Sequence, residues 1–277
     1  MTLTDILFRR QPWLITPDAH AAMLAAAQSP PEGFSAIFQS SLTADNDGND
    51  NCDLLTVEDG IGIVPVQGPM VRNPDLISRY LFGATDIEEI IAAVNAAAQR
   101  PDVQAVLLDI DSPGGSVNGT PELAQAVSDL CKSKYVYAFS GGQMCSAAYW
   151  VASQCDAIYI TPSARVGSIG VILPLVDSTE AYQQAGLHVE VFAAGKYKST
   201  GMPGVSLTDD QRQWLQSDVE EIASDFRSAV LARGRSIPAE AMEGQSFSAK
   251  QAMRFNLAGT VKSRDAALAM LRSRHVA

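Results

Sequence analysis

One serine stands at the kind of junction where a nucleophile can act. It is Ser146, in the stretch SGGQMCSAAYW of residues 140–150. The apolar residues 135–139 predict a buried strand, and residues 147–152 predict the first turns of a helix. Backbone N–H groups lack partners at a helix start, so a serine there can attack a carbonyl while nearby N–H groups hold the oxyanion. The same composition is also typical of a turn that packs a helix closely on a sheet, and this stretch alone leaves both interpretations open.

A second candidate loop, DSPGGS at residues 111–116, follows the apolar residues 103–110. The ends of strands in an open α/β sheet form the ligand crevice, and two glycines let the backbone approach a ligand closely. Neither GxGxxG nor GxxxxGK[ST] is present, so this is no phosphate-binding loop. The loop is either a peptide-binding turn that donates an N–H to an oxyanion or simply a tight turn.

A serine nucleophile needs a base, and the histidines are poor candidates. The chain has three: His20 in the N-terminal part, His188 at the border of a predicted strand, and His275 near the C-terminus. None of them stands in the context of a catalytic triad.

A lysine can serve as the base when it is neutral, which requires burial to lower its pKa from about 10.4 by several units. The loop AGKYKSTG of residues 194–201 follows a predicted strand and holds two lysines. Lys196, if it lies close, would push the pKa of Lys198 in the same direction. Two lysines in a loop are also typical of solvated surface charges.

Four motifs occur in a specific order along the chain: SPGG at 112–115, SGGxxxS at 140–146, RVGSIGV at 165–171 and GKYK at 195–198. This set resembles the signal peptide peptidase A family of serine peptidases, family S49, over roughly residues 60–265. The resemblance implies an α/β, ClpP/crotonase-like fold with repeated ββα/βαβ units and a Ser–Lys dyad that can be completed between neighbouring chains. The site residues it implies are the nucleophile Ser146, the base Lys198, the lysine-orienting Ser168, and an oxyanion hole from Gly114 or Gly115 with the N–H of Ala147.

The sequence differs from the family pattern at two places, and it lacks a histidine that a catalytic triad would need. Ala147 stands where many family members have glycine, and NLAGT at residues 256–260 replaces the usual Gly-Leu-Val-Asp. Clp proteases, which share the fold, carry a histidine in the region that here is GSIG at residues 167–170. The missing histidine favours a dyad over a triad.

The order of predicted elements is that of an α/β domain, because strands and helices alternate from residue 61 onward. Residues 166–173 and 189–192 are among the predicted strands, and residues 209–233 predict a long helix capped by Thr208. We expect a loosely attached N-terminal helical extension and polar linker over residues 1–51, and the peptidase domain over 52–277. The Asp/Asn-rich part of the linker lacks the calcium-loop pattern, so we expect no metal and no cofactor.

The composition limits which binding partners are expected. The 277 residues carry a net charge of −11, which argues against nucleic acid and anionic membranes as partners. No export signal or transmembrane-length apolar run is evident, so four reduced cysteines and a cytoplasmic location are expected. Trp214 and Phe226 belong to an apolar stripe on the long helix, which predicts a core-facing or subunit-facing surface and, with the family, a homo-oligomer.

The function expected is a serine endopeptidase acting on protein or peptide substrates. The helical extension and the missing membrane anchor resemble the phage and prophage branch, which implies capsid, scaffold or portal proteins as partners in the host cytoplasm or prohead. The alternatives are a peptidase that degrades signal peptides or misfolded chains, a non-catalytic assembly scaffold, and a crotonase-like acyl-CoA enzyme. Ser146, Lys198 and Ser168 together count against the last two.

Overall fold

The computed structural model describes residues 12–29 and 54–275. Its strands are β1 (Trp13–Ile15), β2 (Thr56–Glu58), β3 (Ile61–Gln67), β4 (Met70–Val71), β5 (Thr85–Asp86), β6 (Ala105–Asp111), β7 (Gly114–Ser116), β8 (Tyr135–Ser140), β9 (Gln143–Cys145), β10 (Ala157–Ile160), β11 (Arg165–Gly167), β12 (Ser246–Ser248) and β13 (Gly259–Thr260). Its helices are α2 (Pro17–Gln28), α4 (Leu76–Phe82), α5 (Ile87–Gln99), α6 (Thr120–Leu130), α7 (Ala147–Ser153), α8 (Thr179–Gln184), α9 (Asp209–Leu231), α10 (Ala249–Arg254) and α11 (Arg264–His275), with a short 3₁₀ turn at Ala239–Ala241.

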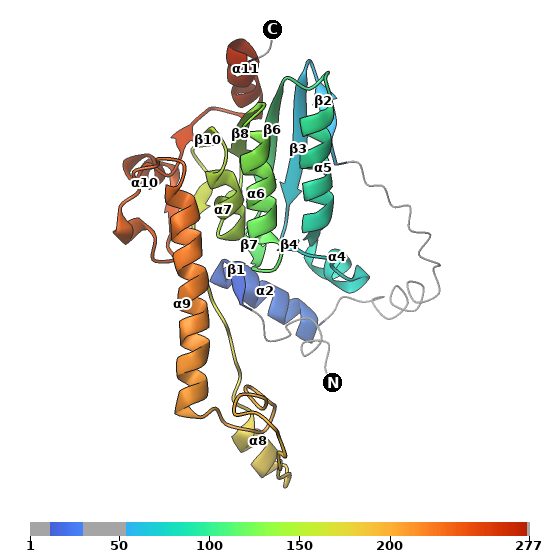
Figure 1. Cartoon of the computed structure of the whole chain (residues 1–277), viewed down its shortest axis with the longest axis vertical. Coiled ribbons are helices and arrows are strands. Elements are labelled where there is room, and N and C mark those ends of the chain that lie inside the picture. Colours follow the sequence, from blue (N-terminus) through green and yellow to red (C-terminus); the bar gives the residue numbers. More distant parts are fainter. Residues whose placement is uncertain (1–11, 30–53, 276–277) are drawn as a thin grey trace.

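The central sheet has six strands in the order β13-β10-β8-β6-β3-β2 (Figure 1). Its strands run parallel except for β2, which pairs antiparallel with β3 at one edge. Twice in succession a long strand is followed by a short strand and a helix: β6-β7-α6, then β8-β9-α7. The short strands belong to two smaller sheets, β1-β7-β4-β5 and β12-β11-β9. The α/β class and the repeated ββα units are therefore confirmed.

The long strands are buried because helices cover both faces of the sheet. Figure 1 shows α5, α6 and α7 side by side over one face, where they share one apolar cluster with alternate residues of β3, β6 and β8. The other residues of those strands pack with α11 in a second cluster that includes Leu107, Phe139 and Leu271. Burial on two faces explains why β6 is apolar almost throughout, as expected for a parallel sheet.

The N-terminal part differs from the expected loose attachment. The helix predicted to begin at Pro17 is present, but the three residues Trp13–Ile15 form a strand that pairs antiparallel with β7 and is buried. Their burial attaches this part to the sheet beside the SPGG loop. The polar linker lies outside the described residues, so the domain boundary after residue 51 stays a prediction.

Residues 173–208, called the arm below, leave the body of the molecule and return beside the start of α9 (Figure 1). The strand predicted over 166–173 is wrong beyond Gly167, and the strand predicted over 189–192 is absent. In the described chain no strand lies beside residues 189–192 to supply hydrogen-bond partners, and their side chains are exposed. The long helix is confirmed: Thr208 caps α9 through a capping box with Gln211.

Over the ranges the structure describes, there is no helix with both the length and the apolar character that crossing a membrane requires.

Candidate active site

Ser146 occupies the position directly before α7, in a backbone conformation that few side chains adopt. Its φ is 51° and its ψ −119°. Holding a non-glycine residue there costs on the order of 1–3 kcal/mol, which the surrounding structure must offset. The N–H of Ser146 donates to the Gly167 carbonyl at 2.8 Å, and the N–H of Trp150 donates to the Ser146 carbonyl at 2.9 Å. The strand-to-helix junction is thus present, and its serine is fully buried.

The SPGG loop is tied to the same junction through Ser112. The N–H of Ser112 donates to the Gln143 carbonyl at 2.8 Å, and the N–H of Cys145 donates back to the Ser112 carbonyl at 3.1 Å. The Ser112 hydroxyl also accepts from the N–H of Gly114 at 3.2 Å. A Cβ built on Gly114 would lie 2.9 Å from the Ser146 Cβ, so these two residues are neighbours.

Both glycines of the loop are required by close backbone contacts. Gly114 has a φ of 112°, and a Cβ there would overlap the carbonyl oxygen of Leu14 on β1. A Cβ on Gly115 would overlap the carbonyl oxygen of Met70 on β4. The close approach that the sequence predicts is therefore made to two strands of the same chain.

Ser168 lies beside Ser146 on the segment that follows β11, where the Gly167 and Gly170 carbonyls both accept hydrogen bonds from Ser146. It has a φ of 54°, and its N–H donates to the Gln245 carbonyl at 2.7 Å. Two residues on, the Gly170 carbonyl accepts from the Ser146 hydroxyl at 3.5 Å. Ser168 is buried and lines a cavity of about 390 Å³ together with Ile15, Gly170 and Arg227, among others. The structure shows no hydrogen bond from the Ser168 hydroxyl to any of the described residues.

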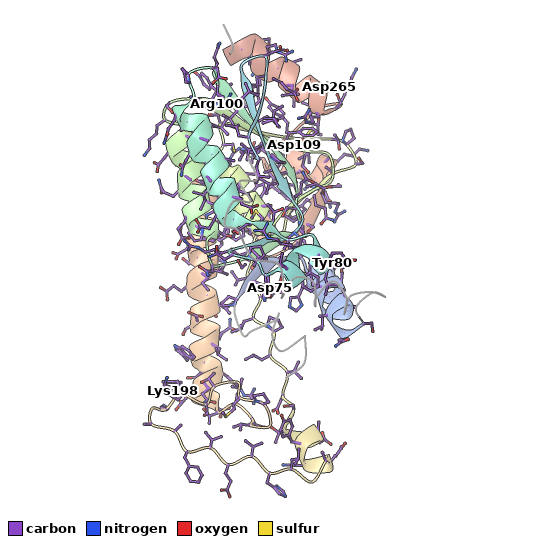
Figure 2. All side chains as sticks on the ribbon, turned by 90° about the vertical axis from the view of Figure 1, so that its right-hand side faces the viewer. Asp75, Tyr80, Arg100, Asp109, Lys198 and Asp265 are labelled. Carbon is purple, nitrogen blue, oxygen red and sulfur yellow. The ribbon has the colours of Figure 1, made fainter. Side chains whose placement is uncertain are left out.

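Lys198 is not brought to Ser146 within the chain. It is an exposed residue of the arm, and Figure 2 shows it beside the far end of α9. That loop is fixed there because the Gln211 side chain donates to the Lys196 carbonyl at 3.4 Å. The junction of Ser146 lies near the other end, where Trp150 of α7 stacks on Phe226 of α9 with ring centroids 4.8 Å apart. From Gln211 to Phe226 the helix rises about 22 Å.

The neighbouring lysine has a partner of its own. Lys196 forms an ion pair with Asp210 in the first turn of α9. The hydrogen bond to that carboxylate raises the pKa of Lys196, so it stays charged at neutral pH. Next to it, Tyr197 packs against Trp214 with ring centroids 5.4 Å apart. The loop is thus positioned on α9, with Lys198 left exposed.

Cys145, His20 and His188 are the other candidate nucleophile and bases in this part of the chain. Cys145 adjoins Ser146, but burial raises the pKa of its thiol and keeps it protonated at neutral pH. His188 is exposed on the arm, and His20 lies on α2 with its ring edge against Trp13. Burial lowers the pKa of His20. Among the described residues no group of three or more His, Cys, Asp or Glu side chains could hold a metal.

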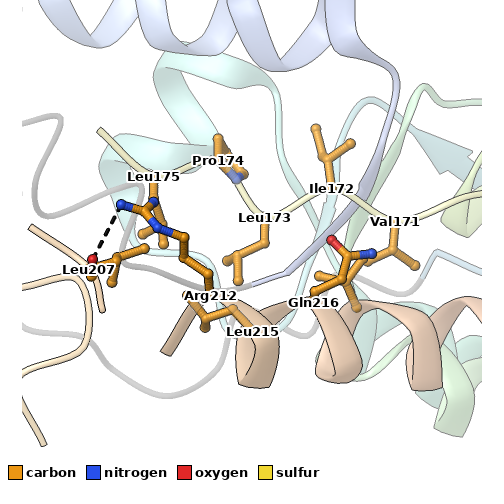
Figure 3. A pocket seen from close by; sticks show the side chains of 10 residues that line it. Val171, Ile172, Leu173, Pro174, Leu175, Leu207, Arg212, Leu215 and Gln216 are labelled. Atoms are coloured by element: carbon orange, nitrogen blue, oxygen red, sulfur yellow. Dashed lines mark hydrogen bonds between the residues drawn. The ribbon is translucent and has the colours of Figure 1, made fainter. Parts of the chain in front are cut away.

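A second cavity, of about 630 Å³, lies at the base of the arm (Figure 3). Its walls are residues 171–175 on one side and Leu215, Gln216 and Val219 of α9 on the other. The Arg212 side chain crosses its end and donates to the Leu207 carbonyl at 3.2 Å. The cavity is mainly apolar and adjoins the segment that carries Ser168 and Gly170.

One contributor to this region was not predicted from the sequence. β1 lies against the SPGG loop, and Ile15 lines the cavity beside Ser168. The signal was the apolar triplet Trp-Leu-Ile before Pro17, whose packing partner the sequence does not identify.

Comparison with known proteins identifies the family. The profile of peptidase family S49 matches residues 128–276, and the chain belongs to that family. Capsid assembly protease C of Escherichia phage lambda is 32% identical over 71% of this chain and 45% of its own length. Head-tail preconnector protein GP5 of Enterobacteria phage P21 is 33% identical over 63% of this chain and 34% of its own. A putative protease of Methanocaldococcus jannaschii is 33% identical over 61% and 55%.

The chain thus spans between a third and just over half of the length of these relatives. Among solved structures, it is similar to an enoyl-CoA hydratase from Mycobacterium avium subsp. paratuberculosis, at 19% identity and a TM-score of 0.44 over 80% of this chain and 76% of that one.

Proposed function

We propose that the protein is a serine endopeptidase that uses Ser146 as nucleophile and Lys198 as base. The observation that carries this proposal is the buried serine at the start of α7, with the SPGG loop beside it, in a member of family S49. The N–H of Ala147, at the first position of α7, and that of Gly114 or Gly115 would hold the oxyanion.

In the proposed mechanism, the neutral amine of Lys198 takes the proton from the Ser146 hydroxyl as its oxygen bonds to the substrate carbonyl carbon. The carbonyl π electrons move to oxygen, and backbone N–H groups stabilise the negative charge. Collapse of this intermediate breaks the C–N bond, and the lysine returns the proton to the leaving amine. Water then hydrolyses the acyl-enzyme by the same route, which restores Ser146.

We propose further that Lys198 comes from a neighbouring copy of the chain. This is supported by the separation of Lys198 from Ser146 and by exposed apolar side chains on the arm, a composition typical of an interface. Phe192 is 94% exposed and Val176 87%. The hydroxyl of Ser168, which has no hydrogen bond to the described residues, would then accept a hydrogen bond from the incoming amine or donate one to it.

Mixing two inactive variants tests the shared dyad. Ser146→Ala and Lys198→Ala chains should each be inactive, but a co-refolded equimolar mixture should recover about a quarter of wild-type turnover, because random pairing restores one site in four. A matched mixture of Ser146→Ala with Ser146→Gly should recover nothing. If the first mixture also recovers nothing although mixed oligomers form, the dyad is not shared between chains.

The substrate class we propose is capsid or scaffold protein, cleaved during phage head maturation by a homo-oligomer in the host cytoplasm or prohead. Support comes from the two phage relatives, a capsid assembly protease and a head-tail preconnector. The test is incubation with the scaffold and capsid proteins encoded beside the gene, with Ser146→Ala as control. Cleavage of unfolded casein without cleavage of those proteins would favour the degradative alternative.

A further inference from the structure

Strand β1 pairs with β7, whose backbone N–H groups are proposed to hold the oxyanion. Leu14 is paired with Gly115 in the antiparallel ladder between β1 and β7. Two residues on, the N–H of Thr16 donates to the Pro113 carbonyl at 3.0 Å. Antiparallel ladders alternate between hydrogen-bonded and non-hydrogen-bonded pairs, so Leu14 and Gly115 form a hydrogen-bonded pair. The N–H of Gly115, one of those proposed for the oxyanion hole, therefore already donates to the Leu14 carbonyl of the same chain.

The opposite edge of β1 is also occupied. The N–H of Trp13 donates to the Ile172 carbonyl at 2.8 Å, and the N–H of Ile172 donates to the Trp13 carbonyl at 3.0 Å. β1 thus fills a slot between β7 and Ile172, with hydrogen bonds on both sides. An extended substrate can pair with β7 only where no strand is already paired.

This slot directly adjoins the nucleophile. A Cβ on Gly114 would overlap the Leu14 carbonyl oxygen and would lie 2.9 Å from the Ser146 Cβ, so the Leu14 carbonyl and Ser146 flank the same point. Ser146 has no exposed surface. Trp13, Leu14 and Ile15 are 3%, 0% and 3% exposed, which gives the strand three buried apolar anchors.

We propose that Trp13–Ile15 is an autoinhibitory strand. It holds the cleft beside Ser146 closed in the resting chain, and an extended segment of substrate must displace it to pair with β7. This inference rests on the proposed function, because it takes Ser146 as the nucleophile. The rival interpretation, in which β1 is a permanent wall of the cleft, is an outcome of the test below.

The first test loosens the strand and measures how fast a fluorophosphonate probe labels Ser146 in the full-length protein. Leu14→Ala should raise the labelling rate at least tenfold over wild type. The matched control is Leu271→Ala, an equally buried leucine in the cluster across the sheet, which should label at the wild-type rate. Circular dichroism and thermal unfolding check that both variants are folded. A folded Leu14→Ala that labels no faster than wild type overturns the inference.

The second test locks the strand and does not depend on the stability of Leu14→Ala. Trp13 and Ser116 face each other as a non-hydrogen-bonded pair, the geometry in which two antiparallel strands come closest. The double variant Trp13→Cys/Ser116→Cys should label at least tenfold more slowly when oxidised than after reduction, whereas Trp13→Cys alone should show no such change. Equal rates in the locked and reduced forms overturn the inference and leave the proposed function intact. Failure of every form, wild type included, to label at Ser146 overturns the proposed function itself.

Discussion

The surroundings of Ser146 and the arm are built in opposite ways. Around Ser146, all residues of α7 are buried, and backbone hydrogen bonds connect the loop of Ser112, β9 and the Ser146 junction. On the arm, Phe192 and Val176 expose most of their surface, and residues 187–193 have no regular structure. Exposed apolar surface of this kind is unfavourable in water and is typical of a surface that contacts another molecule. Under the proposed function, the half of the site around Ser146 is complete within the chain, and the other half, Lys198, would come from a neighbouring copy.

The largest effect should come from Ser146→Ala, which alters the complete half. Removing the nucleophilic oxygen should lower kcat by roughly a thousandfold or more. The midpoint of thermal unfolding should stay within a few degrees of wild type, because the Cβ and the backbone are unchanged. Peptide hydrolysis and calorimetry measure the two quantities. Wild-type turnover in a pure preparation would show that Ser146 is not the nucleophile.

The next largest effect should come from the arm, where substituting its two lysines should have different effects on activity. Lys198→Arg should be nearly inactive, because a guanidinium keeps its proton and cannot act as a base. Lys196→Arg should retain most activity, since arginine can keep the ion pair with Asp210. In the wild type, kcat/KM should rise with pH as the catalytic lysine loses its proton, and this limb should survive in Lys196→Arg. The opposite ranking of the two variants would move the base to Lys196.

An intermediate effect should follow a charge placed on the exposed surface of the arm. Phe192→Asp should dissociate the proposed oligomer and lower specific activity by about tenfold or more at dilute concentration, because a carboxylate is costly to bury at an apolar interface. Leu76→Asp is the control, an exposed apolar residue on α4 that is 51% exposed. Light scattering reports the mass and peptide hydrolysis the rate. A Phe192→Asp oligomer as large as wild type would remove the arm from the interface.

A smaller effect is expected at Ser168, where Lys198 of the neighbouring copy would meet the surroundings of Ser146. Ser168→Ala should lower kcat by roughly tenfold, because the amine of Lys198 loses a hydrogen-bond partner but keeps its role. The rising limb of the pH profile, which reports the lysine, should also shift, and a merely structural serine would not cause this. Ser246→Ala is the control, a half-buried serine on β12. An unchanged limb with a lowered rate would assign Ser168 a structural role.

The sequence predicted the complete half better than the arm. Local signals defined that half: the apolar run of β8, the small residues around Ser146 and the two glycines at 114–115, whose steric need the structure explains. The strand predicted over 189–192 is absent, because an alternation of apolar residues does not reveal whether a partner strand exists. β1 was missed for the same reason, since three residues become a strand only through β7 and Ile172.

The apolar stripe on α9 is another case in which the sequence pattern does not reveal the packing partner. The sequence spacing assigned Trp214 and Phe226 to one apolar stripe, which allowed either a core or a subunit contact. The structure divides them: Phe226 stacks on Trp150 in the core, whereas Trp214 is 46% exposed beside the arm. Periodicity identifies an apolar face, but only the tertiary contacts tell which part of it this chain covers.

The smallest effect should come from Cys145, the rival nucleophile next to Ser146. Cys145 is 1% exposed, and its thiol lies 3.8 Å from the Ser246 hydroxyl, on the side of β12. Because burial raises the pKa of this thiol, the reactive thiolate is scarce at neutral pH. Cys145→Ala should therefore keep kcat/KM within about twofold of wild type and should lower the free energy of unfolding by about 1 kcal/mol through lost packing. Cys155→Ala, also 1% exposed, is the matched control for that loss. If Cys145→Ala abolished turnover while remaining as stable as Cys155→Ala, the nucleophile would be the cysteine, and the complete half of the site would have to be reassigned around it.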